Sequence, residues 1–555
     1  MMYGIKGEDF TGKTVLFSGG KSGVIVAQRP PMAFVICDFS SYNTESDSAI
    51  EILDSRFSIT VGESLLGTNV DFYGQELKSS EKDDSQVEPF CHRAMFAPIP
   101  QVKDIALINS PLLTGSAMVD ALAPIGKGQN MLVIGQNGVG QRDLAIGMMS
   151  AQKGGKVKCI YALTTSDPKE REEVKERIRR AGIIDDIVLV TMRESENESE
   201  TECPARSAEA VSAAATACSI GEAFALAKGE DALVIIDDID EHKIFWDWTT
   251  RVLVDIFGVD SVVKDDADGG ASSEMRGFYS NLIQRAGRFK ESNGGGSMTL
   301  VLLSTLNGAF RNSDDNEEDD IFTADDFAES SDKIKQRIDI LVNKNIPLTA
   351  KTLRKIEIPV PVASDSENQR RFALAHADDL ISMSDGQIWL DEKLYAQGQR
   401  PPMDAQRSVT RIGIGADTKS RADAPAMRGL AGGLRFDFAQ ANSLEGAGAN
   451  SGAEKLVLKK KSYLLAMHQD AINGGRNLSE NCVALLAAST GSLSSTIEAG
   501  GEAGTEEGQA AIDGLLKHIW QSAPQTMAEI DTTLDLSEDA RATLEESVLD
   551  YFSLD

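Results

Sequence analysis

The stretch "GQNGVGQR", residues 135–142, has the spacing of a phosphate-binding loop. The apolar run "MLVI" precedes it and the helical pattern "DLAIGMMSAQ" follows it. Such a loop requires this order, because unpaired N–H groups at a helix N-terminus hold the phosphates. Three glycines would let the backbone turn sharply and approach a ligand closely: Gly135, Gly138 and Gly140. The pattern predicts a nucleotide pocket.

Two side chains that give such a loop its chemistry are missing. Gln141 stands where a lysine would contact the β and γ phosphates, and Arg142 stands where a Ser or Thr hydroxyl would bind Mg²⁺. Loss of one charge-assisted hydrogen bond costs roughly 1.5 to 3 kcal/mol, or roughly ten- to two-hundred-fold in affinity. The planar fork of Arg142 is no direct substitute. We therefore expect binding of ATP or ADP with Mg²⁺ to be weak or absent, without efficient hydrolysis.

The second half of a nucleotide site would be a hydrophobic strand that ends in an acidic residue. "ALVIIDDID" supplies this pattern, with Asp237 first and Asp238 next. Asp237 would organise Mg²⁺ through water. The alternative is an ordinary buried strand that meets an acidic turn.

A formal GxxxxGK[ST] pattern also occurs at residues 7–14, "GEDFTGKT", and includes Lys13. Few residues precede it, and the β-type run "VLFSGG" follows where a helix is needed. We interpret this match as chance. The alternative, an independent ATPase that uses Lys13, stays open at this point.

Composition limits the class of protein. The 555 residues carry a net charge of −31, which argues against free nucleic acid as a partner. The cysteines and histidines lack metal-ligand spacing, and six thiols in so long a chain indicate a reducing compartment. The apolar runs are too short for a membrane span, and no targeting segment is visible.

The elements around the loop predict an α/β protein. Short β-branched runs over 15–72 indicate a small all-β unit, and strands alternate with helical segments from about residue 104, as in a mostly parallel sheet. Residues 311–371 look like an acidic insertion with little structure, either a solvated loop or a docking element. From about residue 436 the pattern is helical, and Ser537 is placed as an N-cap.

Five stretches, in order, resemble the alpha subunit of the rotary F-type ATP synthase. The final helices resemble it more loosely. The five are "VGESLLGTNVDFYGQEL" (61–77), "LLTGSAMVDALAPIGKGQNMLVIG" (112–135), "ACSIGEAFALAKGEDALVIIDD" (217–238), "FYSNLIQRAGRFKESNGGGSMTLVLLSTLNG" (278–308) and "LISMSDGQIWLDEKLYAQGQRPPMDAQRSVTRIGIGADTK" (380–419).

The resemblance implies three domains. They are a β-barrel at 1–62 that lacks its start, a RecA-like nucleotide domain at 63–417 that contains the insertion, and a C-terminal helical domain at 418–555. It also implies a noncatalytic subunit that alternates with catalytic beta-type subunits in a hetero-hexameric ring and contacts central and peripheral stalk subunits. We expect no catalysis by the chain alone.

The resemblance also assigns site residues. Arg411, in "SVTRIG", matches the arginine offered across the interface to the beta subunit's ATP, while Arg400 and Pro401, in "GQRPP", match the adenine-side wall. Asp237 matches the acidic residue near Mg²⁺. Ser166 falls near the position of the beta subunit's catalytic glutamate, and a serine cannot act as a general base there.

Family membership would place the chain at the surface of an energy-transducing membrane, without direct insertion, and the mitochondrial inner membrane is favoured over the plastid thylakoid. A second hypothesis is a repurposed pseudo-ATPase scaffold or regulatory paralogue outside a turning ring. The altered loop and the missing barrel start favour that alternative. A beta-type partner in a purification would discriminate between the two.

Overall fold

The structure is a computed structural model. It describes residues 2–3, 8–17, 22–37, 50–77, 88–155, 157–193, 204–258, 273–305, 335, 337–338, 341–342, 348, 364–411, 430, 434–444, 451–469 and 475–553. The chain divides into two compact units: Met1–Thr305 with Ile381–Asp555, and Leu306–Leu380. The first unit contains every residue discussed as a site below.

The N-terminal strands form an antiparallel sheet in the order β1-β4-β3-β2-β5. A second, two-stranded sheet joins β6 to β8. These elements confirm the expected all-β unit as far as Val61, and its own small core is built around Val15 and Ile25. The last part of the expected range, β7 Asn69–Val70, instead joins the central sheet. The bounds of the strands in the two N-terminal sheets are β1 Met2–Tyr3, β2 Lys13–Phe17, β3 Ser22–Arg29, β4 Met32–Cys37, β5 Ile50–Arg56, β6 Ser58–Val61 and β8 Cys91–Ala94.

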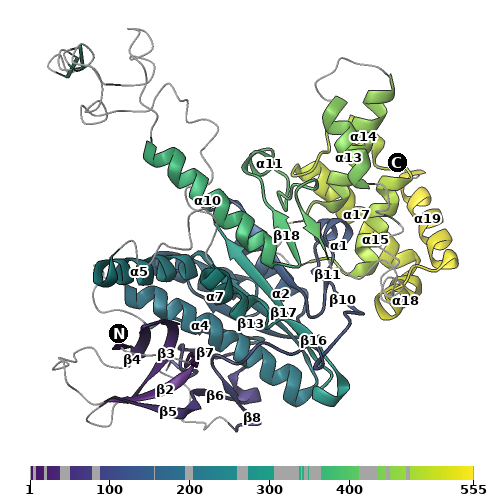
Figure 1. The fold of residues 1–555 in the computed structure, drawn as a ribbon. Coiled ribbons are helices and arrows are strands. Elements are labelled where there is room, and N and C mark those ends of the chain that lie inside the picture. The colour runs from purple at the N-terminus through teal and green to yellow at the C-terminus, as the bar shows by residue number, and fades with distance from the viewer. Residues whose placement is uncertain are drawn as a thin grey trace. The chain divides into compact units, whose positions relative to one another are not determined.

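The central sheet confirms the α/β fold class (Figure 1). Its main path runs β19-β18-β12-β17-β15-β13-β14-β7, and every neighbouring pair along it is parallel except β18 with β19. The bounds are β7 Asn69–Val70, β12 Asn130–Ile134, β13 Val157–Leu163, β14 Ile187–Thr191, β15 Asp231–Asp237, β17 Ser297–Ser304, β18 Gly386–Trp389 and β19 Val409–Thr410. Two short strands extend the sheet beside β17: β16 Gly287–Phe289 and β9 Ile105–Ala106.

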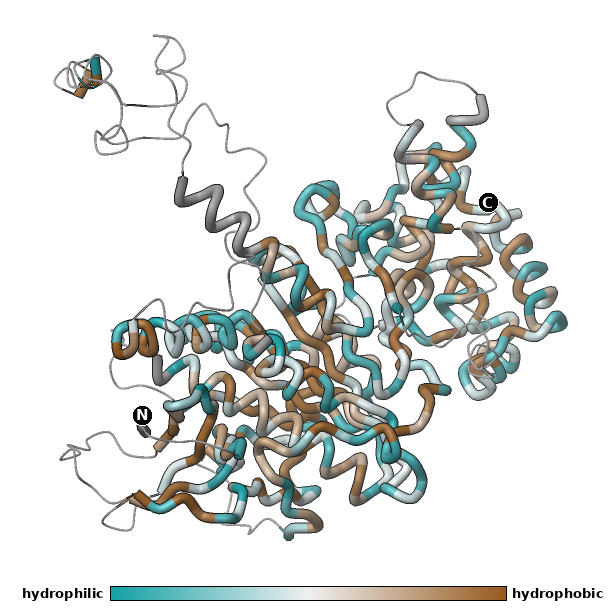
Figure 2. The backbone as a smooth tube through the Cα atoms, viewed as in Figure 1, coloured by the Kyte–Doolittle hydropathy of each residue, from teal (hydrophilic) through white to brown (hydrophobic). Residues whose placement is uncertain are grey.

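Helices cover both faces of this sheet, whose strands are mostly apolar (Figure 2). Strands β12, β14 and β17 are buried at every residue. Leu233 and Ile235 share a core with α2 and the C-terminal helices, whereas Val234 lies under Gly221 of α4. The helices of this region are α1 Ala117–Leu122, α2 Gln141–Ser150, α3 Pro168–Arg180, α4 Pro204–Ala223, α5 Asp240–Phe257 and α7 Ser273–Ile283.

One segment of the described residues, Arg206–Lys228, is long and apolar enough to cross a membrane by length and composition. It consists of α4 and the π-helical turn Phe224–Lys228 that continues it. Within its most apolar window, 89% of the segment is buried inside the protein. A core helix packed on a sheet has this composition, and the sequence prediction did not register it because small polar residues interrupt the apolar run.

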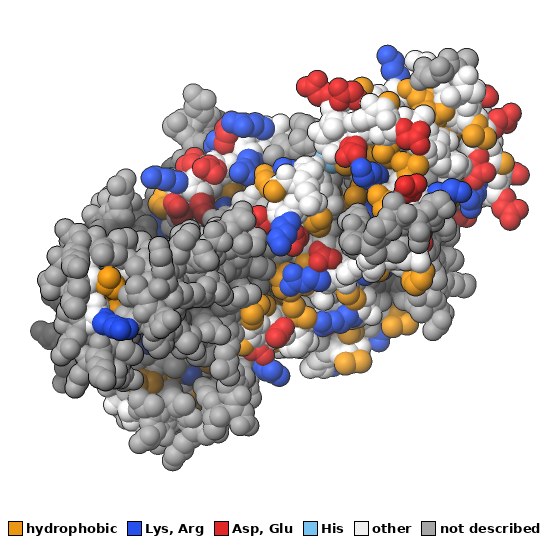
Figure 3. Space-filling model, turned by 90° about the horizontal axis from the view of Figure 1, so that it is seen from above, with side chains coloured by type: hydrophobic (Ala, Val, Ile, Leu, Met, Phe, Trp, Pro, Cys, Tyr) orange, Lys and Arg blue, Asp and Glu red, His pale blue; other side chains and the backbone are white. Residues whose placement is uncertain are grey.

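Helices close the chain, as expected, and their inner faces join one continuous core with the central sheet. Ser537 caps the last of them, since its Oγ accepts a hydrogen bond from Ala540 N at 3.2 Å. Acidic side chains gather over this end of the chain (Figure 3). The helices are α13 Leu434–Leu444, α14 Ser451–Met467, α15 Leu478–Ser489, α16 Ser494–Glu498, α17 Glu506–Ser522, α18 Pro524–Thr533 and α19 Glu538–Ser553.

The expected acidic insertion, 311–371, lies mostly outside the described residues. Where it is described near its end, the expectation of little structure is wrong. Helix α10, Ser364–Met383, begins inside the expected insertion and leads directly into β18. The sequence "SENQRRFALAHADDL" allows this helix because it contains no proline or glycine.

Candidate functional site

The predicted loop lies between the C-terminal end of β12 and the N-terminus of α2, at the edge of the sheet where the parallel strands end. Gly138 and Gly140 have positive φ angles of 81° and 100°, which other residues rarely adopt. The space beside both glycines is open, because a Cβ at either position would have no atom within 4 Å beyond its chain neighbours. The structure therefore confirms the strand–loop–helix context expected from the sequence.

Gln141, at the position of the missing lysine, folds back onto the loop. Its Nε2 donates to the carbonyl oxygen of Gln136 at 2.8 Å, and the residue is only 4% exposed. A Cβ on Gly135 would lie 3.0 Å from that same Nε2. A side chain at position 135 would therefore crowd the Gln141 amide, which closes the loop on itself.

Arg142 binds two carboxylates, one at the end of a neighbouring strand and one on a neighbouring helix. Its Nε lies 3.0 Å from each oxygen of Asp237, the last residue of β15. Its Nη2 donates to Glu170 Oε2 at 2.8 Å, in the first turn of α3. The three side chains form what we call the Arg142 cluster: Arg142, Asp237 and Glu170.

Neighbouring polar groups hold this cluster in place. Tyr161 Oη donates to Asp237 Oδ2 at 3.1 Å, and Thr165 Oγ1 donates to Glu170 Oε2 at 3.0 Å. Asn137, inside the loop, donates from Nδ2 to Glu170 Oε1 at 3.2 Å. The loop, β13, β15 and α3 are therefore joined through one hydrogen-bonded network.

The electrostatics of the cluster follow from its burial. Burial raises the pKa of Asp237 above its ordinary value, and the Arg142 charge offsets only part of that rise. Burial also opposes ionisation of Glu170, but the hydrogen bond from Arg142 lowers its pKa. For Arg142 the burial effect is exceeded by the attraction of Asp237, which raises its pKa and keeps the guanidinium charged.

Magnesium does not fit beside Asp237 in this arrangement. The guanidinium of Arg142 already contacts both oxygens of the carboxylate, and position 142 offers no hydroxyl as a ligand. The described residues also contain no group of three or more His, Cys, Asp or Glu that could hold a metal ion. Asp237 therefore lies where the sequence predicted it, but it binds a protein cation.

Polar groups just after β15 and just before α3 form hydrogen bonds with nearby backbone or with each other. Asp238 has a φ of 73°, and its Oδ1 accepts a hydrogen bond from Asp240 N at 3.1 Å. Ser166 donates its backbone N–H to Glu241 at 3.2 Å. Asp167 accepts from Lys169 N and caps α3. In each case a carboxylate accepts a hydrogen bond from a backbone N–H near the end of a strand.

Pro401 lies beside Leu144 and Gly147 of α2, and Arg400 precedes it in the chain. The guanidinium of Arg400 stacks on Tyr395 with 3.6 Å between Cζ and the ring centroid, and it donates to the carbonyl of Gln399 at 2.8 Å. Pro401 faces Leu144 across a space of about 10 Å³. That space holds about one water molecule, which is too small for a purine ring.

Arg411 lies at the opposite edge of the sheet from the loop. It follows β19, whose Thr410 pairs with Gly386 at the start of β18, whereas the loop follows the end of β12 beside Trp389. The guanidinium of Arg411 donates to the carbonyls of Ile381 and Ser384 and is exposed. The structure therefore separates Arg411 from the chain's own loop.

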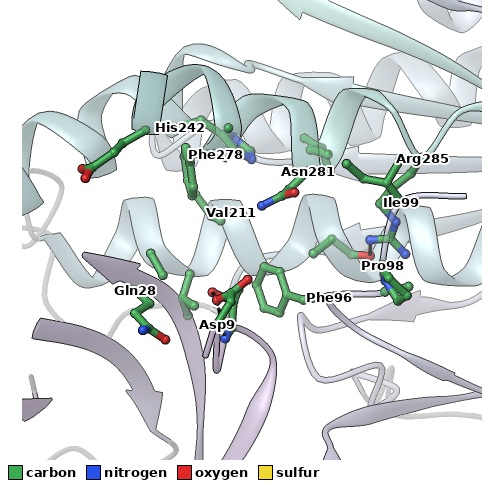
Figure 4. A pocket seen from close by; sticks show the side chains of 18 of the residues that line it. Asp9, Gln28, Phe96, Pro98, Ile99, Val211, His242, Phe278, Asn281 and Arg285 are labelled. Carbon is green, nitrogen blue, oxygen red and sulfur yellow. Dashed lines mark hydrogen bonds between the residues drawn. The ribbon is translucent and has the colours of Figure 1, made fainter. Parts of the chain in front are cut away.

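The pattern at 7–14 has no phosphate-loop geometry in its described part. Lys13 begins a strand, β2, and its Nζ lies 3.7 Å from Asp54. A cavity of about 480 Å³ does lie nearby, between the N-terminal strands and helices α5 and α7, with His242, Phe278 and Asn281 along one wall (Figure 4). It is separate from the predicted loop.

Sequence reasoning missed Glu170, the third member of the Arg142 cluster, and Tyr161, which donates to Asp237. A usable signal exists, because β12, β13 and β15 are parallel and their carboxyl ends meet at one edge of the sheet. Tyr161 lies near the end of β13, and Glu170 lies in the first turn of the helix that follows. An unpaired arginine predicted at that edge could have been assigned Glu170 as an acidic partner.

The chain is similar to known proteins over most of its length. Residues 115–245 match the family model described as "ATP synthase alpha/beta family, nucleotide-binding domain". ATP synthase subunit alpha of Clostridium botulinum (strain Alaska E43 / Type E3) is 27% identical over 419 residues, which cover 74% of this chain. ATP synthase subunit alpha of Dehalococcoides mccartyi (strain ATCC BAA-2100 / JCM 16839 / KCTC 5957 / BAV1) is 26% identical over 436 residues, which cover 77% of this chain.

The matches cover less of the relatives than of this chain. They span 65% of the Clostridium botulinum subunit and 67% of the Dehalococcoides mccartyi subunit. The matched model covers the loop, β13, α3, α4, β15 and the start of α5, and so includes the whole Arg142 cluster. The bacterial relatives do not favour a mitochondrion over a plastid.

Proposed function

We propose that this chain, an alpha-subunit-like protein with a nucleotide-binding domain of the ATP synthase alpha/beta family, is a noncatalytic subunit of an ATP synthase catalytic head. In this role it supplies Arg411 to the catalytic site of a neighbouring beta-type subunit and supports proton-driven ATP synthesis. Its own nucleotide site is weakened or lost.

The observation that carries the proposal is the separation of Arg411 from the chain's own loop. The exposed guanidinium lies at the amino-terminal edge of the parallel strands, while the loop lies at their carboxyl edge. A guanidinium that stabilises phosphoryl charge must reach the phosphates directly. Arg411 can do this only for a nucleotide held by another chain.

The remaining expectations belong to the same proposal. The ring would contain beta-type subunits, with central and peripheral stalk subunits bound to it, at the surface of an energy-transducing membrane. We place the domain boundaries near residues 62 and 417. Arg400 and Pro401 would form the adenine side of a pocket that retains its wall but has little free space.

The test is the replacement of Arg411 in the assembled complex. Arg411→Ala should depress ATP turnover strongly while the complex still assembles, because a correctly placed arginine contributes about 10³- to 10⁵-fold to such rates. Arg407→Ala is a matched control, since Arg407 stacks on Trp389 of the same chain at 3.6 Å. Unchanged turnover in Arg411→Ala would contradict the proposal.

A second candidate is a scaffold or regulatory paralogue that keeps the fold outside a turning ring. The Arg142 cluster favours it, because a loop closed by its own side chains needs no ligand. Purification of the tagged chain discriminates between the two functions. Recovery without any beta-type partner would support the scaffold.

A further inference from the structure

We propose that Arg142 has replaced magnesium as the cationic partner of Asp237, so that the loop is complete without metal or nucleotide. The inference rests on the proposed noncatalytic role of the chain and concerns how the loop of that subunit is stabilised. It predicts a subunit whose folding does not respond to Mg²⁺ or to magnesium nucleotides.

The geometry of the cluster is the first support. Both Asp237 oxygens lie 3.0 Å from Arg142 Nε, and Oδ2 also accepts from Tyr161 at 3.1 Å. The side chain of Asp237 is 3% exposed and that of Arg142 is 15% exposed. A cation that approached Asp237 would have to displace a buried, charge-assisted contact.

The charge around the loop is the second support. Arg142 carries one positive charge and faces two carboxylates, Asp237 and Glu170. On α3, Arg171 donates to the carbonyls of Thr165 and Ser166. Arg177, on the same helix, is paired with Asp143 at 2.7 Å. Each of these arginines already has partners within the protein, so none is available to bind phosphates. The positive end of the α2 dipole alone attracts anions only modestly.

The closure of the loop is the third support. The Gln141 amide binds the loop carbonyl of Gln136, and Asn137 ties the loop to Glu170. These side-chain hydrogen bonds hold the loop in place, as hydrogen bonds to a bound phosphate would do. Of the three loop glycines, Gly138 and Gly140 have open space beside them, whereas Gly135 does not.

The experiment uses the full chain and measures its thermal unfolding midpoint in EDTA, in Mg²⁺, in ATP with EDTA and in ATP with Mg²⁺. The midpoint of the wild type should be the same in all four conditions. A ligand that binds only the folded state raises the midpoint. A rise that depends on Mg²⁺, or a rise with ATP, would overturn the inference.

Direct metal binding gives a second readout that needs no variant. Mn²⁺, followed by its paramagnetic resonance, serves as the probe for a magnesium site. The wild type should bind no Mn²⁺. If the wild type does bind Mn²⁺, and Arg142→Thr abolishes that binding or leaves it unchanged, the inference is overturned. Arg142→Thr, which frees Asp237 and adds a hydroxyl, should gain Mn²⁺ binding of at least about tenfold higher affinity than the wild type.

Two comparisons keep the result specific. Arg177→Ala removes a partly exposed arginine of α3 that binds Asp143 of α2, the helix that carries Arg142, and should not gain metal binding. An Arg142→Thr chain without a metal response would overturn the inference. A chain that ignores Mg²⁺ but purifies without beta-type partners would refute the subunit role, a failure that the metal and nucleotide measurements distinguish from a failure of the Arg142 cluster.

Discussion

The Nε of Arg142 lies 3.0 Å from both carboxylate oxygens of Asp237, so an arginine from the loop's own helix occupies the acidic end of β15. This pairing joins α2 to the strand that, by its pattern, would organise magnesium. It explains how the chain can keep the layout of a phosphate loop after the lysine and the hydroxyl have been replaced. The loop is stabilised by the protein itself.

Removal of Arg142 should destabilise the fold more than removal of a surface arginine does. Arg142→Ala leaves Asp237 buried without its cation, which typically costs about 3 to 5 kcal/mol. Arg177→Ala breaks a partly exposed pair and should cost at most about 1 kcal/mol. Urea denaturation measures both, and equal losses would show that the Arg142 cluster contributes no special stability.

The double variant Arg142→Ala with Asp237→Asn isolates the pair itself. Asn removes the charge that Arg142→Ala leaves uncompensated, so the double variant should recover part of the lost stability. Strict additivity of the two single changes would contradict the coupling.

The stability of the fold should depend on pH through Asp120. Burial raises the pKa of Asp120 from 3.8 to about 7, although Thr114 donates two hydrogen bonds to it. A carboxyl group whose pKa is raised in the folded state stabilises the fold at pH values below its pKa in the unfolded chain, about 3.8. This stability is lost as the pH rises through the folded pKa of about 7. The shift corresponds to about 4 kcal/mol as an order of magnitude.

Asp120→Asn removes this titration and keeps an acceptor for Thr114. The variant should therefore gain stability over the wild type as the pH increases from about 4 to about 7, with no further gain above that range. Denaturation midpoints at a series of pH values check it. A constant difference between the two chains would contradict the raised pKa.

The loop glycines should tolerate alanine poorly for a conformational reason. Gly140 has a φ of 100°, so Gly140→Ala should cost about 1 to 2 kcal/mol even though no atom obstructs the new Cβ. Gly277, in helix α7, also has open space, but Gly277→Ala should stabilise by about 0.5 to 1 kcal/mol. Thermal unfolding measures both changes, and the same sign for both would exclude the backbone explanation.

A buried ion pair should hold the N-terminal strands to the central domain. Arg285 is 1% exposed, binds Glu222 at 2.7 Å, and donates to the carbonyl of Met95 at 3.0 Å. Arg285→Met would leave Glu222 with only Arg93 as a partner, and we expect a loss of about 3 kcal/mol or more. Calorimetry that showed no loss would contradict this role.

Sequence reasoning found the fold and the position of the loop because both depend on local patterns. The hydrophobic runs of β12 and β15 and the glycines of the loop carry their own signals. Local patterns could not predict that Arg142 pairs with Asp237, because Asp237 is 95 residues away and the contact exists only after the parallel strands align. The same holds for Glu170, which sequence reasoning left unused.

The predicted role of Arg411 also depends on information outside one chain. The sequence indicated the residue only through its resemblance, and the fold adds that it lies at the far edge of the sheet from the loop. Here its guanidinium contacts carbonyls of its own chain, Ile381 and Ser384. A neighbouring subunit would have to compete with these contacts.

The most direct test of the account is a native mass spectrum of the tagged chain purified with its partners. We predict a ring in which this chain alternates with beta-type subunits, and no magnesium nucleotide bound to the chain itself when it is released from that ring. A free chain, or an assembly without any beta-type subunit, would contradict the proposed function.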